Sequence, residues 1–165
     1  NEFSDFARMP KPILKDNNLV SLIKDNINLL NELDNDIEIN LNAAKPDIFL
    51  NSDSEQLSRV FLNLIKNSIE SIQDKKLDNV NYKGKIDIIV NENLEKINFT
   101  IIDNGLGFGI FANNIKEILN PYFTTKQKGT GLGLAIVNKI INDHNGKINF
   151  MSIKEGAKIE IIFIK

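Results

Sequence analysis

A long helical pattern of apolar residues between Asp53 and about Lys75 constrains the fold more than any other feature of the sequence. Apolar residues recur there every three or four positions, which places them on one face of a helix. Ser52 or Asp53 can cap its first turn. Because a helix with one wide apolar face has to bury that face, the chain must supply a second layer to pack against it. The residues of this face are Leu57, Val60, Phe61, Leu64, Ile65, Ile69 and Ile72.

The second layer is predicted from segments that alternate apolar and polar residues or run apolar over the length of a strand. Two further amphipathic helices are predicted over residues 19–33 and 133–143, a helical pattern occurs over 1–9, and a weaker one occurs over 113–119. These elements predict an α+β two-layer sandwich, in which helices cover one face of a sheet. The predicted strands are 37–41, 85–90, 97–102, 147–153 and 157–164, the last four forming two hairpins, with a short apolar piece at 47–50.

Residue usage excludes several classes of function. The 165 residues carry 20 basic and 22 acidic side chains, a balance that argues against a nucleic-acid partner. The absence of cysteine excludes disulfides and Cys-ligated metal sites, and the single histidine, His144, makes a His-rich metal site hard to build. No apolar run approaches the length of a membrane span, so we expect a cytoplasmic location and no membrane contact by this segment.

Asparagine is unusually frequent, at 25 of 165 residues. Asn, Ile and Lys share A/T-rich codons, so this frequency reflects either a nucleotide bias or an Asn-rich functional surface. The Asn residues are scattered along the chain, which favours the nucleotide bias. Any single Asn is therefore weak support for a site.

The glycine-rich stretch from Gly129 to Leu134 leads into the helix predicted over 133–143. A glycine turn at a helix N-terminus offers free backbone N–H groups and the positive end of the helix dipole to a phosphate. The stretch lacks the third glycine of the dinucleotide-binding pattern, because Leu134 stands there, and Lys128 precedes Gly129, which is not the Walker order. Taken alone, it is either a phosphate-binding loop or an ordinary turn.

Two other features permit both a binding and a structural interpretation. Asp103 ends a predicted strand just before Gly105, so it could accept a hydrogen bond from the amino group of a ligand or cap its own loop. Asn63 and Asn67 lie one turn apart on the long helix, where amide oxygens could assist Mg²⁺ beside phosphates. Chance, given so many Asn residues, explains this pair equally well.

In this order, the segments resemble the ATP-binding catalytic domain of sensor histidine kinases, in the superfamily that also includes gyrase, MutL and Hsp90. The resemblance covers residues 13–165. Residues 1–12 are similar to the end of the second dimerisation helix in nitrogen-regulation sensors of the NtrB/NtrY type. The matching segments are RVFLNLIKNS at 59–68 (N box), DNGLG at 103–107 (G1 box), NPYFTTK at 120–126 (F box) and GTGLGLA at 129–135 (G2 box).

This resemblance implies the Bergerat ATP-binding fold, with three helices over one face of a mixed, mostly antiparallel sheet of about five strands. It implies binding of ATP or ADP with Mg²⁺, with Asn67 as the metal ligand and Asp103 as acceptor for the adenine amino group. A lid over residues 108–130 would close on the nucleotide. The other implied nucleotide-binding residues are Asn63, Lys66 (which could equally extend into solvent), Gly105, Gly107, Tyr122, Phe123, Thr124, Lys126, Gly129, Thr130, Gly131, Leu132, Gly133 and Leu134.

Four positions depart from the family's pattern. Asn63 stands where hydrolysing relatives place a Glu that activates water, so we expect phosphoryl transfer rather than efficient ATP hydrolysis. Ser71 replaces an aromatic residue that many kinases carry four positions after the metal-binding Asn. Ala157 replaces a common Thr whose hydroxyl faces adenine, and Asn120 replaces an acidic residue.

The implied function is that of a two-component sensor kinase. Its ATP-binding domain would donate the γ-phosphoryl group to a His on a dimerisation helix outside this sequence, for relay to an Asp of a response-regulator receiver domain. We expect no catalytic residue within the sequence, because His144 matches a structural turn at a helix end. We expect the intact sensor to be a membrane-anchored bacterial homodimer. The alternatives are a nucleotide-binding but inactive regulatory module and an anti-sigma-type serine kinase of the same superfamily.

Overall fold

The structure, a computed structural model, describes residues 8–108 and 133–165 of the chain. The helical pattern over 113–119 and nearly all of the one over 1–9 lie outside these residues. Within the two ranges, none of the helices combines the length and the apolar character needed to cross a membrane.

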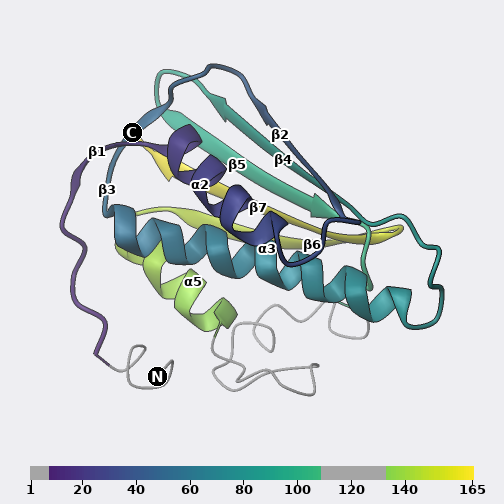
Figure 1. Ribbon diagram of the computed structural model, residues 1–165. Coiled ribbons are helices and arrows are strands. Elements are labelled where there is room, and N and C mark those ends of the chain that lie inside the picture. Colours follow the sequence, from purple (N-terminus) through teal and green to yellow (C-terminus); the bar gives the residue numbers. More distant parts are fainter. Residues whose placement is uncertain (1–7, 109–132) are drawn as a thin grey trace.

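Five strands form one mixed sheet (Figure 1). β2 runs parallel to β4, with Ile39 opposite Ile86, and the other three pairings are antiparallel. The sheet and its strand directions confirm the predicted fold class. In spatial order the strands are β2 (Glu38–Ala43), β4 (Lys85–Glu92), β5 (Lys96–Asp103), β7 (Gly156–Ile164) and β6 (Lys147–Ile153).

Three helices, α2 (Leu19–Asn31), α3 (Ser54–Lys76) and α5 (Gly133–Asp143), lie together on one face of this sheet (Figure 1). The seven apolar residues predicted for α3 are all at most 2% exposed. Each such side chain contributes about 1.5–3 kcal/mol when it is buried, so this face is a main source of stability. Phe61 of α3 meets Phe99 of β5 with ring centroids 5.0 Å apart, which joins the two layers at their centre.

A second, two-stranded sheet joins β1 (Lys15–Asn18) to β3 (Phe49–Ser52) in antiparallel register. The sequence predicts only an apolar piece over 47–50 and no strand over 15–18. The strand β1 reads KDNN, so it has no apolar alternation to find. Asparagine side chains hold it instead: Asn17 Nδ2 donates to the carbonyl of Ser52 at 2.8 Å, and Asn18 Oδ1 caps α2 by accepting from Val20 N–H at 3.1 Å.

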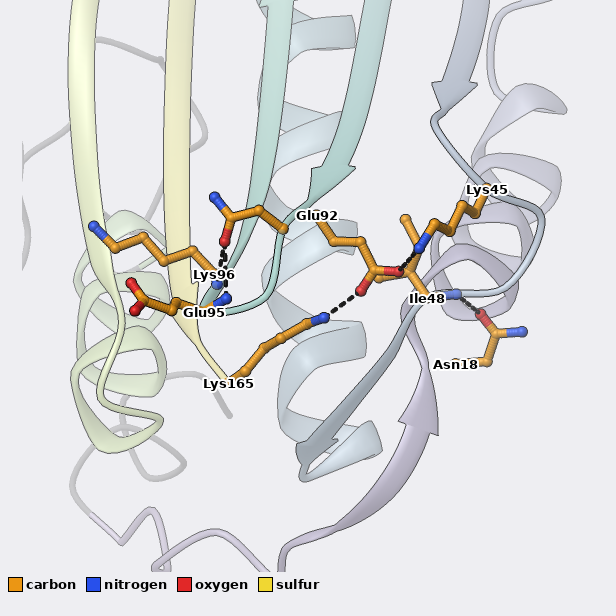
Figure 2. Close-up of polar contacts among 8 residues, drawn as sticks. Asn18, Lys45, Ile48, Glu92, Glu95, Lys96 and Lys165 are labelled. Atoms are coloured by element: carbon orange, nitrogen blue, oxygen red, sulfur yellow. Dashed lines mark hydrogen bonds and ion pairs between the residues drawn. The ribbon is translucent and has the colours of Figure 1, made fainter.

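Polar contacts join separate segments of the chain at the edge of the domain that lies far from the predicted site (Figure 2). The carboxylate of Glu92, at the end of β4, lies 3.1 Å from Lys45 Nζ and 2.6 Å from Lys165 Nζ. Hydrogen bonds from Lys165 and Lys45 hold the pKa of Glu92 below its usual value. The network ties the segment after β2 and the end of β7 to β4.

The turn between β6 and β7 depends on Gly156, whose φ is 113°, a conformation that side-chain-bearing residues rarely adopt. A Cβ at this position would also overlap the carbonyl oxygen of Asp103. Glycine is therefore the only residue type that at position 156 lets this turn approach the end of β5.

We predict that Gly156→Ala lowers the free energy of unfolding by on the order of 3 kcal/mol, from backbone strain and overlap. Urea denaturation followed by circular dichroism measures the change. Lys154→Ala, at an exposed position of the same turn, is the matched control and should change stability by less than about 0.5 kcal/mol. Equal stability of both variants would contradict the close approach.

Candidate functional site

Three of the predicted segments meet on α3. Ser68 of α3 contacts Asp103 at the end of β5, and Ser71, one turn later, contacts Gly105. Toward the beginning of the helix, the amide oxygen of Asn63 lies against Gly133, the first residue of α5, because a Cβ on that glycine would be 3.2 Å from it. One face of α3 therefore connects the G1 segment to the start of α5.

Asp103 is a buried carboxylate, 6% exposed. Its Oδ1 accepts the N–H of Gly105 at 2.9 Å, and its Oδ2 accepts the hydroxyl of Ser68 at 3.0 Å. Burial raises the pKa of Asp103 above its ordinary value, against the opposing effect of bonds from Gly105, Ser68 and the backbone of Ala157. A carboxyl group of this kind, with acceptor positions beyond these bonds, can receive one donor from a ligand.

The turn after Asp103 rests directly on α3. A Cβ on Gly105 would overlap the side chain and backbone of Ser71, so glycine is required for this approach. The Ser71 hydroxyl accepts the backbone N–H of Leu106 at 2.9 Å. Gly107, with φ 74°, follows and faces the backbone of Gly156. The backbone of Gly105, Leu106 and Gly107 is thus held in place by contacts to α3 and to Gly156.

Asn104 anchors the same turn from the other side. Its Oδ1 accepts the N–H of Lys85 at 2.8 Å, and its carbonyl accepts the Tyr82 hydroxyl at 2.7 Å. Lys75 Nζ donates to that carbonyl at 3.3 Å and lies 4.4 Å from the centre of the Tyr82 ring. A cation over an aromatic face is favourable in such a partly buried place.

The amide of Asn63 is oriented by its own helix. Its Nδ2 donates to the carbonyl of Arg59 at 2.9 Å, which leaves the oxygen toward Gly133. Asn67 is half-buried one turn later, whereas Lys66 is exposed. Leu134 is half-buried and packs against the core from α5. Asn63 therefore lies on the side of α3 that faces the start of α5, and Asn67 follows it one helical turn later.

Half of the predicted positions lie outside the described residues, and the structure leaves them as predictions: Tyr122, Phe123, Thr124, Lys126, Gly129, Thr130, Gly131 and Leu132.

The structure places three residues at the site that are not predicted from the sequence: Ser68, Lys75 and Tyr82. It also gives Ser71 a role in holding the G1 turn, where the sequence only marked it as a departure. Ser68 and Ser71 lie one and four positions after Asn67, so their place on the helix could have suggested them. Tyr82 could not be predicted from the sequence, because its partner is a backbone atom 22 residues away.

Comparison with known proteins decides the family. Residues 52–165 match the family of histidine kinase-, DNA gyrase B- and HSP90-like ATPases. The chain belongs to this family. It is the catalytic, ATP-binding domain of a two-component sensor histidine kinase, as its similarity to sensor kinases over most of its length shows.

The kinase domain is 35% identical to nitrogen regulation protein NtrY of Azorhizobium caulinodans over 94% of its own length. It is 39% identical to sporulation kinase A of Bacillus subtilis over 79%. It spans about a fifth of the length of both relatives, 20% in each case. The catalytic domain of histidine kinase ThkA superimposes with a TM-score of 0.79 at 27% identity, covering 93% of this chain and 96% of that one. ThkA has also been crystallised with response regulator protein TrrA, and that structure matches at 22% identity with a TM-score of 0.80, covering 99% of this chain and 45% of that one.

The histidine of the kinase domain, His144, holds two helices together at the end remote from the G1 turn. It is buried, its Nδ1 lies 2.8 Å from the carbonyl of Ile140, and its Nε2 accepts the backbone N–H of Asp53 at 3.1 Å. A nitrogen that accepts a hydrogen bond carries no proton, so Nδ1 carries it and donates to Ile140. Both ring nitrogens are engaged, which agrees with the structural role predicted for His144.

Asp53 extends this junction to the segment before β1. Its carboxylate caps α3 by accepting Gln56 N–H at 3.1 Å, and it also accepts Ile13 N–H at 2.9 Å. Burial raises the pKa of Asp53, but backbone bonds from Ile13, Gln56 and Glu55 outweigh it and lower the pKa below its ordinary value. Gln56 Nε2 donates to the carbonyl of Pro10 at 3.0 Å. The segment over residues 10–13 is therefore docked on the first turn of α3.

We predict that His144→Leu costs about 1–3 kcal/mol of unfolding free energy, because the N–H of Asp53 loses its acceptor in a partly buried place. Urea denaturation measures the loss. Asn142→Ala, at an exposed position near the same helix end, should change stability by less than about 0.5 kcal/mol. A leucine variant as stable as the parent would show that the imidazole serves only as apolar filling.

Proposed function

We propose that this domain binds Mg²⁺–ATP along the face of α3 that meets Asp103 and Gly133, and donates the γ-phosphoryl group to a His on a separate dimerisation helix. From that His the group would pass to an Asp of a response-regulator receiver domain. The observation that carries the proposal is the joint placement of a buried carboxylate, two half-buried amides and a helix start on one surface.

The adenine end of the nucleotide fits Asp103. Its carboxylate is nearly covered, so a hydrogen bond made there is little weakened by water. The ionised form accepts only, which suits the amino group of adenine. Gly105 and Gly107 would shape the pocket without side chains, and Ala157 contributes a backbone contact to Asp103 in place of a hydroxyl.

The phosphate end fits the start of α5. Gly133, the first described residue of this helix, has no side chain of its own, and the N-terminal end of a helix attracts phosphate. Asn63 faces the same point with its amide oxygen. The other residues that we propose to contact the nucleotide are Lys66, Leu134, Tyr122, Phe123, Thr124, Lys126, Gly129, Thr130, Gly131 and Leu132.

The residues present fit Mg²⁺ when phosphates supply most of its charge. No cluster of three or more His, Cys, Asp or Glu side chains that could hold a metal occurs within residues 8–108 and 133–165. A cation there must therefore rely on neutral oxygens and on the nucleotide, and Asn67 would offer its amide oxygen. Bound Mg²⁺ would neutralise charge on the β- and γ-phosphates.

Transfer to an external acceptor is favoured over hydrolysis. Asn63 is a neutral amide whose Nδ2 is engaged by Arg59, so it has no basic group with which to activate water. His144, the one histidine of the sequence, has both nitrogens hydrogen-bonded. The acceptor His is therefore proposed to lie outside this sequence.

The docked segment supports the proposed connection to a dimerisation helix. Residues 1–12 are proposed as the end of that helix, and residues 13–165 as the catalytic domain. Pro10 and Ile13 are both bonded to the first turn of α3, so the path into the domain is fixed. The crystallised pair of ThkA and its regulator TrrA supports a receiver domain as a partner.

Two alternative functions also include nucleotide binding but differ in what happens to the phosphoryl group. An inactive regulatory module is favoured by Ser71 and Ala157, which depart from the family's pattern. A serine kinase of the anti-sigma type shares the superfamily but would phosphorylate a Ser-bearing partner protein.

We predict that Asp103→Asn and Asn67→Ala each weaken Mg²⁺–ATP binding at least about tenfold, which corresponds to about 1.4 kcal/mol. Asp103→Asn replaces an acceptor oxygen by a donor, and Asn67→Ala removes the proposed metal ligand. Isothermal titration calorimetry with ATP and MgCl₂ measures both. Asn149→Ala, an exposed Asn on β6, is the matched control. Unchanged affinity in both variants would refute the site.

We predict phosphorylation in trans when this domain is mixed with the dimerisation helices of its own full-length kinase and γ-labelled ATP. The label should be acid-labile, as phosphohistidine is, and should be absent from His144. Nucleotide binding without any transfer supports the inactive module. Acid-stable label on a Ser-bearing partner instead supports the serine kinase.

A further inference from the structure

Ser68 is a buried residue of α3 that contacts Asp103 at the end of β5. It is 3% exposed, and its hydroxyl donates to Asp103 Oδ2 at 3.0 Å. The other carboxylate oxygen accepts the N–H of Gly105. Both oxygens of Asp103 are thus held by groups of the protein, one of them a side chain that can be changed without touching the backbone.

A buried hydroxyl on a helix has an alternative partner, the carbonyl four residues earlier. Ser68 donates to the carboxylate instead, which places a positive hydrogen beside an oxygen that has lost most of its water. A donor in that position favours the ionised form of a carboxyl group. Among the described groups, Lys75 of α3 acts on Asp103 in the same direction by its charge.

The charge state of this carboxyl decides which ring it can recognise. An ionised carboxylate accepts the amino hydrogen of adenine, whereas a protonated one can present an O–H donor toward it. A ring with a carbonyl in place of the amino group, as in inosine, has the opposite preference. Any group that keeps Asp103 ionised therefore selects the amino-bearing ring.

We propose that Ser68 is a positioning residue for nucleotide selection: its hydroxyl orients the Asp103 carboxylate as an acceptor and so favours adenine over a 6-oxo purine. This inference rests on the proposed ATP site. Ser68 itself would contact only Asp103.

The sign of the pH dependence follows from the burial of Asp103. Burial raises its pKa, and the Ser68 bond opposes that rise. In the parent protein, affinity for ATP should fall as the pH drops through the raised pKa. Removal of the hydroxyl raises the pKa further, so the same fall should begin at a higher pH.

Ser68→Ala, Ser68→Thr and Ser58→Ala test the proposal, the last being a serine of the same helix whose hydroxyl bonds to Asn26. Affinities for ATP and for inosine triphosphate with MgCl₂ are measured by calorimetry between pH 5 and 8. For Ser68→Ala we expect the acid limb of ATP binding to move up by roughly one pH unit. We expect the preference for ATP over inosine triphosphate to fall about tenfold near the new limb. Ser68→Thr should restore the parent profile, and Ser58→Ala should leave it unchanged.

A measurement without nucleotide separates this inference from the proposed function. The titration of the Asp103 carboxyl carbon, followed by ¹³C NMR, should move to higher pH in Ser68→Ala and not in Ser58→Ala. A parent protein that binds no ATP overturns the proposed function, while the NMR shift still reports on the Ser68 bond. An unshifted carboxyl titration, or equal loss of ATP and inosine triphosphate binding, overturns the inference.

Discussion

The carboxylate of Asp103 is the group on which the site depends. A charged group that is 94% covered is costly unless donors replace its lost water. Those donors come from three elements: Ser68 of α3, Gly105 of the following turn, and the backbone of Ala157 at the start of β7. Satisfying one buried charge therefore fixes the helix, the turn and the β6–β7 connection relative to one another.

The start of α3 and the end of α5 are joined by hydrogen bonds of an imidazole rather than of a carboxylate. There His144 accepts from the N-cap of α3 and donates within α5, so a neutral imidazole joins the end of one helix to the start of the other. Since α3 carries Asn63 and α5 carries Gly133, this distant junction helps to set the separation of the groups that we propose face the phosphates. The domain thus positions its site by bonds at both ends of α3.

Much of the fold could be predicted because apolar periodicity is local. It identified the three helices, the five strands of the main sheet and the buried face of α3. It missed the β1–β3 ribbon, because KDNN is held by Asn17 and Asn18 rather than by apolar packing. It also missed Tyr82 and Lys75, whose partners are backbone carbonyls 22 and 29 residues away. Asn63 and Asn67 emerged only from the order of the motifs, because Asn is common everywhere in this chain.

The distribution of charge at the site supports the proposed transfer to another molecule. Among the residues that the structure describes, its buried carboxylate is Asp103, at the end proposed for adenine, while the end proposed for the phosphates presents an amide and the start of α5. A carboxylate at position 63 would repel the phosphates and could activate water. Asn63 avoids both effects, and its orientation by Arg59 leaves only an oxygen facing the start of α5. This arrangement agrees with the proposal that the acceptor is a side chain on a separate helix, outside this surface.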